Sequence, residues 1–378
     1  MIVSSSYEDV LIDDDISGEA YFAQDGESVV YTKKLSECEY AVVKYDFSTK
    51  EKTILSGPYA YAYFGSSNPV FENYIAWKDF RDNCPILGDM SDVYLTEFDT
   101  GVERKITSYH HEIVYPIVTS HYIGWVSYAK DTLGIFFKDL NKNELPKLAY
   151  SFTCKDFMTM SFDGTIIDGK AFFVFNHYDN GYTIRTLELE NKNIKVIASG
   201  EDIDAKVYTI NNHVFFYDPK KLYDYDIRTE KIKEVYNLNK DLRVNPLGQS
   251  STGNFYFVKS KRNGTALSIM EYNPSTGFIK DIRIFSNNEH SLFNNGCLYD
   301  NKIVYLMRIN NTNSSVRTSD LYTFDTNSKS EEKITNTYET EYMSKIAGYR
   351  IIYLLLHTGA ADNGEIYQIR ELRCVFIK

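Results

Sequence analysis

The sequence predicts an all-β protein that folds as a single β-propeller. Eight short apolar runs each end in an aromatic residue, and these residues are Tyr31, Trp77, Trp125, Phe173, Phe216, Phe257, Tyr305 and Tyr353. Successive members are 46, 48, 48, 43, 41, 48 and 48 positions apart. An Asp- or Asn-containing turn follows several of these runs, and no long segment has the 3.6-residue periodicity of a helix. A repeat in the forties, built from strands and turns, is typical of a propeller blade.

Each repeat is expected to supply four strands. A short inner strand comes first, as at residues 68–71, 115–118 and 205–208, and the aromatic-ended strand comes second. A third strand with alternating polar and apolar residues and an outer edge strand complete the unit. Eight units fit between about Gly18 and the C-terminus, so residues 1–378 are predicted to form one domain of eight four-stranded blades. Seven blades are the alternative, because the intervals of 43 and 41 leave less room for loops.

The first residues fall outside the repeat. We expect the acidic N-terminal segment, residues 1–15, to close the ring, with Tyr7 to Ile12 pairing with the last blade, since closure removes exposed sheet edges. The run Asp13-Asp14-Asp15 is interpreted as a solvated acidic tail, because it lacks the spaced oxygen ligands of a calcium loop.

Acidic residues end many of the third strands, as in Val42–Lys50 and Asp320–Thr326. Asp or Asn before Thr, Ser or Gly bonds to the following backbone and favours tight turns. We therefore interpret Asp46, Asp99 and Asp226 as turn residues and not as catalytic carboxylates.

The composition and net charge of the chain limit the classes of partner that are expected. The chain has 378 residues, 43% of them hydrophobic, which is ample for a buried core. Its 52 acidic and 41 basic residues give a net charge of −11, which repels phosphate backbones, so no nucleic-acid partner is expected. The longest apolar stretch near the C-terminus, Ile351–Leu356, is too short to span a bilayer, so no membrane insertion is expected.

Five scattered cysteines without a C-x-x-C pair argue against a zinc site and against a disulfide framework. The N-terminus has neither a basic region nor a long apolar run, so no secretory signal is visible. A cytoplasmic location is the prediction.

The Tyr/Phe-Asp-x-x-Thr/Gly unit followed by Lys-x-Ile-Thr resembles the TolB-like propeller repeat, which also occurs in the propeller of prolyl-oligopeptidase-type peptidases. Residues 92–107 (DVYLTEFDTGVERKIT) are the nearest copy, and residues 320–335 are the next. The resemblance implies a propeller. It does not imply peptidase activity, because the sequence has no Gly-x-Ser-x-Gly motif and no room for an α/β-hydrolase domain.

A binding site is expected where the second strand of a blade turns into the third, because loops there share a face with the connections between blades. The longest such loops are residues 79–91 and 308–319. The candidate ligand-binding residues are Arg81, Asp82, His110, His111, His177, Asp179 and His357. Ordinary exposed loop histidines are the simpler interpretation, since no metal-ligand spacing is present; no cofactor, metal or catalytic residue is therefore assigned.

Three functions remain open from the sequence. The first is a non-enzymatic binding or scaffold propeller that presents a loop-rich face to a protein or glycan. The second is a lyase or glycoside hydrolase acting on an acidic sugar, in which His110, His111 and His177 bind metal or move protons and Arg81 grips a carboxylate. The third is a structural component of a larger particle.

Overall fold

A computed structural model describes the fold. The described residues are 7–36, 39–59, 62–63, 69–81, 91–107, 112–119, 121–129, 132–153, 159–167, 169–177, 181–201, 205–217, 220–239, 241–287, 289–293, 297–309, 319–337, 339–360 and 366–377. All regular elements among them are β-strands, and none of them forms a helix long and apolar enough to cross a membrane. The predicted fold class is confirmed: the protein is an all-β, eight-bladed β-propeller of antiparallel four-stranded blades, in two of which the first strand consists of two short segments. The seven-blade alternative is wrong.

Two compact units make up the chain, residues 21–240 and residues 1–20 together with 241–378. The organisation as one domain stays a prediction. We call the first of these the central unit and the second the terminal unit.

The central unit contains blades one to five, apart from residues 16–20 of β2, which belong to the terminal unit. Blade one is β2 (Ile16–Phe22), β3 (Ser28–Ser36), β4 (Glu39–Asp46) and β5 (Lys52–Tyr59). Blade two is β6 (Ala62–Tyr63) and β7 (Val70–Phe71), which both pair with β8 (Tyr74–Asp79), then β9 (Asp92–Glu97) and β10 (Glu103–Lys105). Blade three is β11 (Glu112–Val118), β12 (Tyr122–Ala129), β13 (Thr132–Asp139) and β14 (Lys147–Thr153). Blade four is β15 (Thr159–Ile167), β16 (Lys170–Asn176), β17 (Tyr182–Glu188) and β18 (Ile194–Gly200). Blade five is β19 (Lys206–Ile210), β20 (His213–Tyr217), β21 (Lys221–Asp226) and β22 (Lys231–Asn237).

The terminal unit contains the other three blades. Blade six is β23 (Leu242–Gln249), β24 (Phe255–Lys261), β25 (Ala266–Asn273) and β26 (Phe278–Ile284). Blade seven is β27 (Glu289–Leu292) and β28 (Leu298–Tyr299), which both pair with β29 (Lys302–Ile309), then β30 (Asp320–Asp325) and β31 (Glu331–Lys333). Blade eight is β32 (Thr340–Ala347), β33 (Arg350–Ala360), β34 (Ile366–Phe376) and β1 (Glu8–Asp13).

The aromatic residues that revealed the repeat lie in the second strand of every blade. All eight are at most 2% exposed, so the period in the sequence is the period of the core. In four blades this residue stands opposite an aromatic residue of the third strand and stacks on it, as Trp77 does on Tyr94, with ring centres 6.1 Å apart. The other three pairs are Trp125–Phe136, Phe216–Tyr223 and Tyr305–Tyr322. Directly opposed aromatic pairs stabilise a sheet, so these stacks help fix the register of these four blades.

Turns after the third strands follow the predicted chemistry. Asp46 Oδ1 accepts hydrogen bonds from the backbone N–H groups of Ser48 and Thr49, 2.8 and 2.9 Å away, and Asp226 and Asp325 make the same kind of contacts. The hydrogen bonds from Ser48 and Thr49 lower the pKa of Asp46, which suits a carboxylate used as a turn residue.

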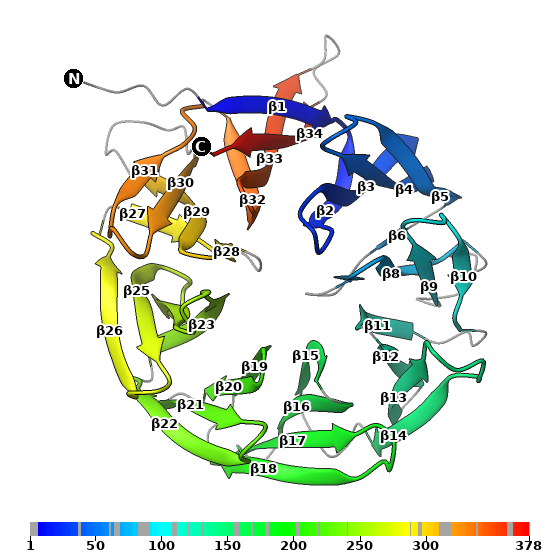
Figure 1. Ribbon diagram of the computed structural model, residues 1–378, viewed down its shortest axis with the longest axis vertical. Helices are drawn as coiled ribbons and strands as arrows, with labels where there is room; N and C mark the ends of the chain where they lie inside the picture. Colours follow the sequence, from blue (N-terminus) through cyan, green and yellow to red (C-terminus); the bar gives the residue numbers. More distant parts are fainter. Residues whose placement is uncertain are drawn as a thin grey trace. The chain divides into compact units, whose positions relative to one another are not determined.

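The last repeat supplies only three strands of its own. The N-terminal strand β1 is its fourth, running antiparallel to β34 with Val10 opposite Cys374. Figure 1 shows β1, in blue, beside β34, in red. The predicted pairing of Tyr7–Ile12 with the last blade is thus confirmed for the strand that begins at Glu8, and β34 is not left as an exposed edge.

Candidate functional site

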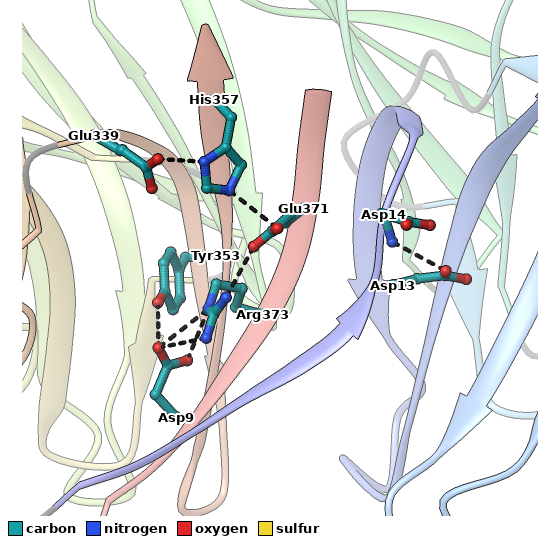
Figure 2. Close-up of polar contacts among 8 residues, drawn as sticks. All are labelled: Asp9, Asp13, Asp14, Glu339, Tyr353, His357, Glu371 and Arg373. Atoms are coloured by element: carbon teal, nitrogen blue, oxygen red, sulfur yellow. Dashed lines mark hydrogen bonds and ion pairs between the residues drawn. The ribbon is translucent and has the colours of Figure 1, made fainter. Parts of the chain in front are cut away.

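The candidate site is a chain of polar side chains in blade eight, near the end where β33 turns into β34. At its centre is His357 on β33, which lies between two carboxylates (Figure 2). Its Nδ1 bonds Glu339, and its Nε2 forms an ion pair with Glu371 Oε1 at 3.1 Å. We call the chain formed by Asp9, Glu339, Tyr353, His357, Glu371 and Arg373 the blade-eight network.

Sheet register explains why these residues meet. His357 stands opposite Ile369 of β34, so Glu371, two residues further on, projects from the same face of the sheet. On the other side, Thr340 stands opposite Leu356, which brings the preceding residue, Glu339, next to His357.

Protonation of His357 is favoured by this setting. Burial lowers the pKa of His357, but the carboxylates of Glu371 and Glu339 raise it by a larger amount, and the net shift is upward. The pKa of Glu371 moves the opposite way: burial raises it, and the contacts with His357 and Arg373 lower it further than that. The pair is therefore stabilised as imidazolium and carboxylate.

The network continues to the N-terminal strand. Arg373 Nη1 donates to Glu371 Oε2 at 2.8 Å, and Arg373 Nε and Nη2 lie 3.1 Å from Asp9 Oδ2. Asp9 also accepts a hydrogen bond from the hydroxyl of the buried Tyr353, at 3.1 Å. Figure 2 shows this unbroken path from Glu339 to Asp9, so one group of charges ties β1 to β33 and β34.

A further carboxyl group, that of Glu341, lies on β32 of the same blade. Glu341 is 1% exposed, and the hydroxyls of Thr335 and Thr337 lie 2.7 and 3.0 Å from its two oxygens. Burial raises the pKa of Glu341 to about 7, even though the hydroxyl contacts lower it. A carboxyl group that holds its proton up to about neutral pH can donate as well as accept a hydrogen bond.

At the turn between β1 and β2 the structure corrects one prediction. Asp14 and Asp15 are exposed, as expected of a solvated run, but Asp13 is only 4% exposed, and its Oδ1 accepts the backbone N–H of Asp14 at 3.0 Å. The interpretation of all three as a solvated tail is wrong for Asp13, because it is the last residue of a paired strand and not part of a free end.

Arg81 lies just after β8, in blade two, where the sequence predicted a ligand-binding residue. Its guanidinium forms ion pairs with Asp79 at 2.7 Å and Glu103 at 2.6 Å, and packs on the ring of Tyr94 at 3.9 Å. Asp79 is fully buried at its side chain. In the structure Arg81 contacts two carboxylates of the protein itself, and the predicted contact with the carboxylate of a ligand stays a prediction.

His177 follows β16 in blade four. Its Nε2 lies 3.1 Å from Thr183 Oγ1, and that hydroxyl also accepts a hydrogen bond from Arg185 Nε at 3.1 Å. The remaining predicted residues, Asp82, His110, His111 and Asp179, lie outside the described residues. Within the described part of the chain, no group of three His, Cys, Asp or Glu side chains could hold a metal ion. A ligand-binding role for Arg81, His177 and His357 stays a prediction.

The sequence pointed to His357 but not to its partners. Asp9 and Arg373 are 364 positions apart, and only the register of β1 on β34 brings them together. The alternating charges of β34, Arg370, Glu371 and Arg373, were the available signal, because an acidic N-terminal strand pairs favourably with such an edge.

Comparison with solved structures shows the same fold in proteins of different activity. A structure described in work on two prolyl endopeptidases matches with a TM-score of 0.57 and 10% identity, over 93% of this chain and 56% of that one. The β-propeller domain of the trilobed protease from Pyrococcus furiosus matches with a TM-score of 0.51 and 16% identity, over 85% and 97% of the two chains. An oligogalacturonate lyase in complex with manganese matches with a TM-score of 0.50 and 10% identity, over 96% and 98%.

These identities show the fold alone. The predicted resemblance to peptidase-type propellers is confirmed at that level, and the chain spans little more than half the length of the prolyl endopeptidase structure. No protein-family model matches the chain, and no curated protein matches its sequence.

Proposed function

We propose that the protein is a non-enzymatic binding propeller that presents the turns between second and third strands to a protein or glycan partner. The observation that carries this proposal is the state of Arg81: its charged group is held by two carboxylates and a tyrosine ring of its own unit. An arginine bound in this way is a fixed part of a surface, and a substrate carboxylate would have to displace Asp79 from a buried pair.

The blade-eight network supports the same proposal. His357 is held on both sides, so its ring orientation is set before any partner arrives. Polar groups that are fixed in advance lose little entropy on binding and give a surface specificity.

An enzyme acting on an acidic sugar is the competing proposal, with His110, His111 and His177 moving protons or binding metal. A structural component of a larger particle is the other. Both make predictions that differ from those of a binding propeller.

Affinity capture from the native cell, followed by mass spectrometry and rebinding of the purified candidate, tests the proposal. We expect the wild-type protein to capture and rebind a partner. A variant in which residues 82–90 and 310–318 are each replaced by Gly-Ser-Gly should lose it. The matched control replaces residues 274–276, in the turn between β25 and β26 at the other end of blade six, with the same tripeptide and should keep it.

Three results would contradict the proposal. The first is a partner that the loop-shortened variant retains, and the second is the recovery of no partner. The third is turnover of an acidic oligosaccharide by the purified protein that is lost on replacement of His110 and His111 by alanine. Recovery of the chain only as a subunit of a large particle would favour the structural role instead.

A further inference from the structure

A groove with a cationic lining lies in the central unit, where blades two and three adjoin. Its volume is about 490 Å³, within the usual range of about 300–1,000 Å³ for ligand pockets. Four basic side chains line it: Arg104 and Lys105 from β10, Lys138 from β13, and Lys142 from the turn before β14. No acidic residue is among the described residues that line it, although the whole chain carries a net charge of −11.

Two of these cations are available to a ligand. Arg104 is exposed and forms no ion pair with any residue in the described part of the chain. Lys142 is paired with Asp139 at 2.9 Å, but its side chain is 54% exposed, so solvent screens this contact. A carboxylate arriving from outside can therefore replace Asp139.

The other two cations are held by neighbouring groups. Lys105 forms an ion pair with the buried Asp92 at 2.8 Å, which offsets its charge. Lys138 Nζ donates to the backbone carbonyl of Glu144 at 2.6 Å, a neutral acceptor that leaves its charge in place. The charges that the groove offers to an anion are therefore those of Arg104 and Lys138, together with that of Lys142 once it leaves Asp139.

Apolar side chains complete the groove. Leu95, Ile106 and Leu140 line it, and Leu145, at its margin, is 81% exposed. Packing of the Leu145 side chain against an apolar group of a partner would remove this exposed apolar surface from water.

We propose that this groove binds an acidic peptide segment of a partner protein, whose carboxylates contact Arg104 and Lys142 and whose apolar side chain packs on Leu145. A peptide fits this lining better than a sugar or a nucleic acid does. None of the described lining residues is aromatic, whereas single-stranded nucleic acids stack on aromatic side chains. The net charge of −11 also opposes long polyanions, while a short acidic segment meets only the local field. The groove lies at the end of blade three where β13 turns into β14, opposite to the β12–β13 turn, so this site is separate from the face proposed above.

Fluorescence anisotropy with the labelled peptide Gly-Asp-Glu-Leu-Asp-Glu-Gly tests the proposal. We expect saturable binding by the wild type that weakens as salt is raised. The double variant Arg104→Glu/Lys142→Glu should bind about tenfold more weakly. A control with the same change in charge, Arg228→Glu/Lys231→Glu on the exposed β21–β22 turn, should bind within about twofold of the wild type.

Further probes separate the contributions. A peptide with Asn and Gln in place of Asp and Glu should lose binding, and Leu145→Ser should weaken it while circular dichroism shows the fold unchanged. The proposal is overturned if the wild type does not bind the acidic peptide, if the double variant and its control behave alike, or if an oligouronate of equal charge binds more tightly than the peptide. The variant in which residues 82–90 and 310–318 are each replaced by Gly-Ser-Gly should still bind the peptide. Peptide binding in the groove and partner binding at the turns between second and third strands can therefore fail independently.

Discussion

Replacing Glu341 with glutamine removes a buried carboxyl group of blade eight whose pKa is raised by burial to about 7. Glutamine keeps the size of the side chain, and its oxygen and nitrogen can still bond to the hydroxyls of Thr335 and Thr337. The variant should therefore fold like the wild type and differ from it mainly in the pH dependence of its stability.

The size of the effect follows from linkage. The folded pKa of Glu341 is about 7 and its ordinary value is 4.5. Between these values the folded protein keeps a proton that the unfolded chain releases, so the free energy of unfolding falls as pH rises. The full difference is worth about 3 kcal/mol, of which about 2–3 kcal/mol is lost between pH 5 and pH 8.

Urea unfolding at pH 5 and pH 8, followed by circular dichroism, measures this difference. We expect the difference in unfolding free energy, variant minus wild type, to increase by about 2–3 kcal/mol from pH 5 to pH 8. The raised pKa of His357 adds a further fall in stability with pH, since its contribution is present below the ordinary pKa and lost through the higher folded one, but it is common to both proteins. Glu8→Gln, an exposed change on β1, is the control. Parallel pH profiles for wild type and Glu341→Gln would refute the reasoning.

Three further predictions concern the blade-eight network, two turn positions with positive φ, and the ion pair of Arg81 with Asp79. Asp9→Ala should reduce the free energy of unfolding by about 2 kcal/mol, because a buried tyrosine hydroxyl loses its acceptor, whereas Asp9→Asn should cost about half as much; urea titration that shows equal losses would contradict this. Lys50→Gly should stabilise by about 1 kcal/mol and Gly101→Lys should destabilise by about as much, because both positions have positive φ, 61° and 64°; thermal unfolding with shifts of the opposite sign would be against it. Arg81→Ala should cost about 3 kcal/mol in urea unfolding, because it leaves the buried Asp79 without its partner, and a loss below about 1 kcal/mol would mean that the pair is not structural.

Periodic burial made the fold readable from the sequence. Residues such as Trp77 and Tyr305 are buried because they lie in the second strand of a blade. The spacing of large aromatic residues therefore predicts the position of each second strand. The Asp-containing turns added the hairpin positions, as Asp46 shows. Both patterns are local, so they can be recognised in a single sequence without an alignment.

The blade-eight network could not be predicted in the same way. It joins Asp9 to Arg373 and Glu339 to His357, and both contacts depend on strand register. A shift by one residue would turn each side chain to the other face of the sheet. The sequence therefore identified His357 as a candidate, but it could not show that Glu339 and Glu371 of the same blade contact its ring.

The proposal of a binding propeller is tested most directly by hydrogen–deuterium exchange of the protein alone and with its rebound partner. The proposal predicts slower exchange at the turns between second and third strands, including the residues next to Arg81 and His357, with other turns unchanged. Exchange that the partner leaves unchanged at these turns would contradict it.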